Sequence, residues 1–207
     1  MTAVAPPHAR ARLSLLQVAG CFTASSVLLG LWVWCADRYF GHAREHLDAT
    51  FPGSGLLRGW VQFDAGWYRS IAEGGYRLVE GQQSNVAFFP LYPLLLRALR
   101  GVFGSTFGAG IALTFSSGLT AVLLFWRWCG DRLDPDAQRL ALGLLLAYPY
   151  AWYLYGAVYA DALFLACTIA AFAALEKDHP ALAGILGALA SATRPVGPAV
   201  VIGLTVR

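Results

Sequence analysis

The sequence has few charged residues. Asp, Glu, Lys and Arg make up only 13% of its 207 residues, whereas a soluble domain carries about 25%. Hydrophobic residues make up 57%, so much of the surface must face something other than water. This composition excludes a soluble globular domain, and the formal net charge of +3 is too small to indicate nucleic-acid binding.

Several chemical signatures are also missing. The sequence contains no P-loop, HExxH or GxSxG motif. Its four cysteines are not spaced for a metal, and we interpret them as small hydrophobic residues in helices. We therefore predict neither a metal nor another cofactor. Lys177 is the only lysine, which together with abundant Ala, Gly and Leu is typical of a GC-rich bacterial source and suggests a bacterial plasma membrane.

Long uncharged runs predict an all-α, polytopic membrane protein. The first run has 24 residues, enough to cross a hydrocarbon core of about 30 Å. It is too long for the apolar region of most cleaved signal peptides, which favours a signal anchor over cleavage. We expect about five spans in one transmembrane domain covering residues 1–207, at residues 13–36, 108–126, 140–156, 162–175 and 181–206.

Residues 37–107 differ from the rest because they are rich in charges, Gly and aromatics. Arg10 and Arg12 before the first run favour a cytoplasmic N-terminus, which makes 37–107 a long first extracytoplasmic loop. Residues 55–74 and 86–102 are expected to form juxtamembrane helices at the membrane surface. The alternative for 86–102 is a short span, which would move the later loop at Asp161 to the cytoplasmic side.

The string at residues 63–76, FDAGWYRSIAEGGY, holds the first candidate site. Asp64 lies among aromatics near the membrane, and a partly desolvated carboxylate is suited to general-base work. Glu73 is the rival acid nearby. Trp67 and Tyr68 offer aromatic faces for a sugar ring. The alternative is an interfacial loop with ordinary solvated charges.

Two ionisable residues lie next to or within later apolar runs. Asp161 is a functional candidate in the string YADALF, although it could instead cap the helix that follows. Arg194 lies within the run 181–206, where a cation needs an anionic partner or a wet cavity. The alternative for Arg194 is snorkelling from a span that ends near it.

Four strings, in this order, resemble the PIG-V type of mannosyltransferase in the GT-C superfamily. They are FDAGWYRSIAEGGY (63–76), NVAFFPLYPLLLRAL (85–99), YADALF (159–164) and ATRPVG (192–197). The resemblance places the catalytic acid at Asp64. It aligns the family's Tyr-Ser-Glu string with Tyr159-Ala160-Asp161, where Asp replaces Glu and Ala replaces Ser. Because family members are considerably longer, we expect this chain to correspond to an N-terminal portion.

The resemblance implies transfer of mannose from a polyprenyl- or dolichyl-phosphate donor to an acceptor hydroxyl, with inversion. The acceptor would be a lipid or glycan, and the lipid bilayer would surround the protein. Asp64, Asp161 and Glu73 are the candidate catalytic acids, and Arg69 or Arg194 would neutralise the lipid phosphate. The alternatives are a non-catalytic partner subunit or degenerate fragment, and a transporter, which should show internal repeats that are absent here. The candidate substrate-binding residues are Trp67, Tyr68, Arg69, Tyr159 and Arg194.

Overall fold

The computed structural model describes residues 12–39, 55–78 and 80–206. Arg10 and residues 40–54 of the predicted loop lie outside this part of the chain. The regular structure within the described residues is helical throughout, with no strand among them. The all-α prediction is confirmed at this level.

Two helices are long and apolar enough to cross a membrane, judged by length and composition. Helix α1 spans Leu15–Tyr39 and α4 spans Thr106–Gly130. Both form because long uncharged runs rich in Leu, Ala and Val satisfy their backbone polar groups internally. Helix α4 begins where Ser105 caps it, since the Ser105 hydroxyl accepts a hydrogen bond from the N–H of Gly108 at 2.9 Å.

The remaining apolar runs form shorter helices, so only two of the five expected spans have the length of a span. The run 140–156 breaks before Pro149, as a proline there implies. The run 181–206 is not the single helix that we expected. It stops at Ser191 and restarts at Pro198, because Pro195 and Pro198 lack the N–H that would continue the helix. The shorter helices are α5 (Pro135–Ala147), η4 (Pro149–Ala151), α6 (Trp152–Tyr155), α7 (Asp161–Leu175), α8 (Pro180–Ser191) and α9 (Pro198–Val206).

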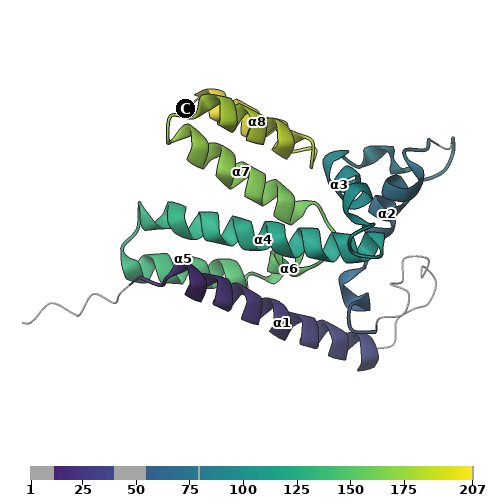
Figure 1. Ribbon diagram of the computed structural model, residues 1–207, viewed down its shortest axis with the longest axis horizontal. Coiled ribbons are helices and arrows are strands. Elements are labelled where there is room, and N and C mark those ends of the chain that lie inside the picture. The colour runs from purple at the N-terminus through teal and green to yellow at the C-terminus, as the bar shows by residue number, and fades with distance from the viewer. Residues whose placement is uncertain (1–11, 40–54, 79, 207) are drawn as a thin grey trace, which may run out of the picture.

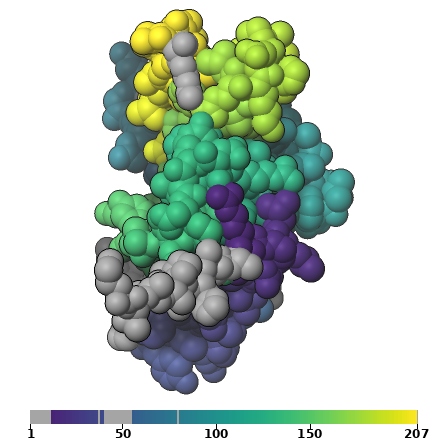
Figure 2. All heavy atoms as spheres, turned by 90° about the vertical axis from the view of Figure 1, so that its left-hand side faces the viewer, coloured from purple at the N-terminus to yellow at the C-terminus, as the bar shows by residue number. Residues whose placement is uncertain are grey.

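Helix α4 forms the centre of the helix packing (Figure 1). It contacts α1 and α6 on one side and α7 on the other, and α7 in turn contacts α8. Figure 2 shows the same order from the end, with α8 and α9 on the far side of α4 from α1. Small residues allow this close packing. Val158 lies against Gly110, and the backbone of Leu154 lies against Gly118.

A separate unit of short helices covers one end of the long ones (Figure 1). It comprises η2 (Arg58–Trp60), α2 (Ala65–Gly74), η3 (Asn85–Ala87) and α3 (Leu91–Leu99). With nine residues, α3 is about 14 Å long and too short to span. The span alternative for 86–102 is therefore wrong, while the position of α3 at a membrane surface stays a prediction.

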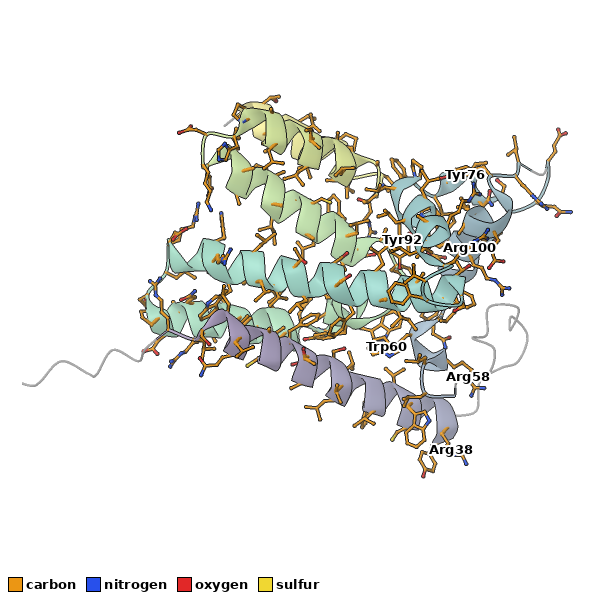
Figure 3. The ribbon with its side chains drawn as sticks, in the orientation of Figure 1. Arg38, Arg58, Trp60, Tyr76, Tyr92 and Arg100 are labelled. Atoms are coloured by element: carbon orange, nitrogen blue, oxygen red, sulfur yellow. The ribbon has the colours of Figure 1, made fainter. Side chains whose placement is uncertain are left out.

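Buried aromatic side chains fix this unit to the long helices. Tyr92 is fully buried, and its hydroxyl contacts Thr114 of α4 at 2.9 Å. Trp60 packs against Gly30 of α1 and Gly156 beside α6. Figure 3 labels both rings at the end where the short helices meet the bundle. The unit is therefore held by long-range packing rather than by its own short helices.

Candidate functional site

A cavity of about 800 Å³ lies where the start of α2, the start of α7 and the end of α8 meet. Its polar part consists of Asp64, Tyr159, Asp161 and Arg194. The rest of its lining is aromatic or aliphatic, from Phe63, Leu145, Tyr148, Tyr150, Ala151, Tyr153, Leu154, Phe164 and Leu165. The cavity therefore offers two carboxylates and one guanidinium beside a largely apolar wall.

Asp64 immediately precedes α2 and occupies its N-cap position. Its side chain makes no capping hydrogen bond, so the carboxylate is not used for the helix. Its backbone N–H donates to the hydroxyl of Tyr159 at 2.9 Å. Phe63, the preceding residue, has a positive φ of 50°, a conformation that bulky residues rarely adopt. The chain thus turns sharply and presents Asp64 at the cavity.

Asp161 and Arg194 form an ion pair inside the cavity, between Oδ1 of Asp161 and a terminal guanidinium nitrogen of Arg194. Asp161 is the first residue of α7, whose N-cap is Ala160, so Asp161 does not cap this helix. Arg194 follows the end of α8, in the break before α9. Arg194 therefore lies outside the helices. The ion pair with Asp161 accommodates its charge without snorkelling to the membrane surface.

The backbone just before Arg194 is held by two hydrogen bonds. Thr193 is buried and its hydroxyl donates to the carbonyl of Ala190 at 2.6 Å. The carbonyl of Ala192 accepts a hydrogen bond from the N–H of Leu91 at 2.9 Å, which connects this break to α3. These bonds fix the backbone on which Arg194 reaches the cavity.

Four of the candidate residues do not line this cavity, although they lie on the adjacent helix α2. Tyr68 is buried and packs edge-on against Phe88, Tyr92 and Tyr159. Its burial raises the pKa of the phenol to about 12. Trp67 stacks on Phe88. Arg69 and Glu73 form an ion pair with each other.

Glu73 is engaged in a polar contact between α2 and α4. Its carboxylate accepts from Arg69 at 3.1 Å and from the hydroxyl of Thr106 at 2.7 Å. Partial burial raises the pKa of this carboxyl, but the hydrogen bonds from Thr106 and Arg69 outweigh burial and leave the pKa lowered. A carboxylate stabilised in this way is a poorer general base, and Glu73 is not among the residues that line the cavity.

The cavity also has an aromatic wall, formed by Tyr148, Tyr150 and Tyr153, which are not among the residues predicted for the site. These residues follow the end of α5, where Pro149 breaks the helix, and the ring of Tyr153 packs against Tyr159 with centroids 4.9 Å apart. The sequence carries a signal for this wall, because five aromatic residues occur between positions 148 and 155 around that proline, although the run 140–156 by itself predicts only a membrane span.

The described residues contain no group of three or more His, Cys, Asp or Glu side chains that could hold a metal. The two acids of the cavity are instead accompanied by Arg194. Chemistry without a metal stays a prediction.

The described residues form helices only, and two of these helices are long and apolar enough to cross a membrane. A cavity with two carboxylates lies at one end of the helices, and these features are consistent with a helical membrane protein. Comparison with known proteins makes this more specific. The chain is 35% identical over 154 residues to "GPI alpha-1,6-mannosyltransferase 2" of Mus musculus. It is 35% identical over 153 residues to the protein of the same name from Rattus norvegicus, and 34% over 154 residues to that of Cricetulus griseus.

Each match covers 69% of this chain and 30% of the relative, so the chain spans less than a third of the length of these proteins. No family model matches the chain, and no solved structure matches it. The matched proteins are mannosyltransferases by name, which supports the resemblance that the four strings carry. The organisms of these relatives give no support to the expected bacterial source.

Proposed function

We propose that this chain is part of a PIG-V-type membrane glycosyltransferase and carries the acid and the phosphate-binding arginine of its active site. The observation that carries this proposal is the cavity, which gathers Asp64, Asp161 and Arg194 from three separate segments. The similarity to three mannosyltransferases supports mannose as the sugar transferred. The donor would be a polyprenyl- or dolichyl-phosphate mannose, and the acceptor a hydroxyl of a lipid or glycan in the membrane.

The reaction would be a single displacement at the anomeric carbon. Asp64 accepts the proton of the acceptor hydroxyl while the acceptor oxygen forms a bond to that carbon. The bond from the carbon to the phosphate oxygen breaks, and the lipid phosphate leaves with the electron pair. Attack from the face opposite the leaving group inverts the anomeric configuration.

Arg194 would neutralise the departing phosphate. It has five N–H donors, and Asp161 accepts from only one terminal nitrogen, so the remaining donors are available to an anion. Asp161 then keeps the guanidinium in the cavity, which suits an orienting partner better than a second base. The apolar wall formed by Leu145, Phe164 and Leu165 would accommodate the first part of the lipid chain.

The test compares the two rival acids in membranes that contain this chain and labelled polyprenyl-phosphate mannose. Asp64→Asn is nearly isosteric but cannot accept a proton. We expect it to reduce mannose transfer by about 10²–10⁴-fold, the usual contribution of a general base. Glu73→Gln removes a carboxylate that lies outside the cavity and should reduce transfer far less.

Three other results of this comparison would contradict the proposed role of Asp64. Parental transfer by Asp64→Asn together with loss in Glu73→Gln would move the base to Glu73. Parental transfer by both variants would reject the catalytic role of this loop. A folded parent that binds the donor without transferring mannose would favour the alternative, a non-catalytic partner or degenerate fragment.

A further inference from the structure

The segment that carries Asp64 is joined to the segment that carries Asp161 by two hydrogen bonds. The N–H of Val158 donates to the carbonyl of Trp60 at 3.1 Å. The N–H of Asp64 donates to the phenol oxygen of Tyr159 at 2.9 Å. The second bond is made by a side chain 95 residues away along the sequence, so it depends entirely on the tertiary structure.

The peptide held by Tyr159 is one that local preferences disfavour. Phe63 has a φ of 50° and a side chain that is 80% exposed, so its own packing contributes little to keeping this conformation. A left-handed backbone at a bulky residue is sterically unfavourable and persists only where surrounding contacts impose it. The Tyr159 hydroxyl is such a contact, because it binds the amide that directly follows Phe63.

Tyr159 itself is rigidly placed. It is 9% exposed, and its ring packs against Tyr68 and Tyr153. Its backbone carbonyl accepts a hydrogen bond from the hydroxyl of Thr114 at 3.3 Å, and Thr114 also contacts Tyr92. A hydroxyl on such a ring can act as a fixed point for a neighbouring loop.

We propose that Tyr159 is a positioning residue, whose phenol holds the Phe63–Asp64 peptide in the turn that presents the Asp64 carboxylate to the cavity. This inference deepens the proposed function and rests on it where it concerns activity. The geometric part concerns only the hydrogen bond and the turn. The two parts can therefore be tested separately.

The first experiment follows amide hydrogen exchange in the isotopically labelled full chain in lipid nanodiscs. Tyr159→Phe removes the phenol oxygen and keeps the ring. We expect exchange at the Asp64 amide to accelerate by about tenfold or more, because its acceptor is lost. The Val158 amide, whose acceptor is the Trp60 carbonyl, should stay protected and serves as the internal control for folding. Unchanged exchange at Asp64 would overturn the proposal.

The second experiment uses the left-handed φ of Phe63. Glycine adopts positive φ without steric cost, whereas alanine removes the same side chain and keeps the cost. In the parent, Phe63→Gly and Phe63→Ala should transfer mannose at similar rates. In the Tyr159→Phe background, the glycine variant should be several-fold more active than the alanine variant, because its turn no longer needs the phenol. Tyr159→Phe alone should lower kcat by about tenfold and leave KM for the donor nearly unchanged.

A substrate contact by Tyr159 would give a different pattern. KM would rise, and glycine and alanine at position 63 would behave alike in both backgrounds, which would overturn the positioning role. If both Asp64→Asn and Glu73→Gln transfer mannose like the parent, the proposed function fails. The exchange measurement still decides whether Tyr159 holds the Asp64 peptide.

Discussion

At the scale of single residues, Arg194 shows how a costly side chain is accommodated. A cation within an apolar run needs an anion, and the structure supplies Asp161 from the start of α7. The break between α8 and α9 places the guanidinium in the lining of the cavity and not within a helix. Arg69, the other candidate for the phosphate, pairs with Glu73 on α2 instead.

We therefore expect Arg194→Lys to weaken binding of polyprenyl-phosphate mannose by about tenfold, because lysine keeps the charge but loses the planar fork. Arg194→Gln should weaken it further. The measurement is titration of the chain in nanodiscs with labelled donor. Arg132→Lys is the matched control, since Arg132 pairs with Glu176 away from the cavity. Unimpaired binding by Arg194→Gln, with impaired binding by Arg69→Lys, would move the phosphate to Arg69.

At the scale of elements, α4 depends on glycines where other segments approach it. A Cβ at Gly118 would collide with the backbone carbonyl of Leu154 in α6, and it would also lie 3.1 Å from the ring of Phe22 in α1. Neither the carbonyl nor the buried ring can move aside easily. Gly118 therefore lets α1, α4 and α6 approach one another closely at this position. Helix α6 also supplies Tyr153 and Leu154 to the lining of the cavity.

We expect Gly118→Ala to destabilise the protein by about 1–3 kcal/mol, although alanine has the better helix propensity. The matched control is Gly143→Ala in α5, where a Cβ meets no atom within 4 Å. That change should be neutral or stabilising by up to about 1 kcal/mol. Thermal unfolding in detergent measures both. Equal melting temperatures for the two variants would contradict the close packing of α4 and α6.

At the scale of the whole molecule, the two acids lie at the same end of the helices, because both line one cavity. Five spans with a cytoplasmic N-terminus would put 37–107 and 157–161 on the same side of the membrane, and this topology stays a prediction. The turn between α7 and α8 returns the C-terminal part of α8 to the end covered by α2 and α3 (Figure 1), which places Arg194 at the same cavity. That this end faces the extracytoplasmic side is still a prediction.

Single cysteines in a cysteine-free background test that orientation. Leu78 and Val196 are 78% and 58% exposed and follow α2 and α8 at the cavity end. Cysteines there should react with an impermeant thiol reagent in intact cells. Lys177 is exposed in the turn between α7 and α8, and a cysteine there should react only after lysis. Labelling of the Lys177→Cys variant in intact cells, with protection of the cysteines at positions 78 and 196, would show that the topology is the reverse of the one predicted.

The sequence by itself determined the helical class, the two long apolar helices and the residue types available for chemistry. These follow from local properties, because uncharged runs favour helices in an apolar solvent and prolines end them. Its strings also identified Asp64, Asp161 and Arg194 one by one. Pro195 and Pro198 also indicate where the run 181–206 divides into two helices. The ion pair between Arg194 and Asp161 depends instead on packing between distant segments.

Only the tertiary structure decided which candidates share a site. Asp64 and Glu73 lie nine positions apart on the sequence, yet Asp64 lines the cavity and Glu73 pairs with Arg69 and Thr106. The reason is that a cavity is formed between segments distant in sequence, and its members are chosen by packing. The bond from Asp64 to Tyr159 spans 95 residues, and no local pattern specifies such a partner.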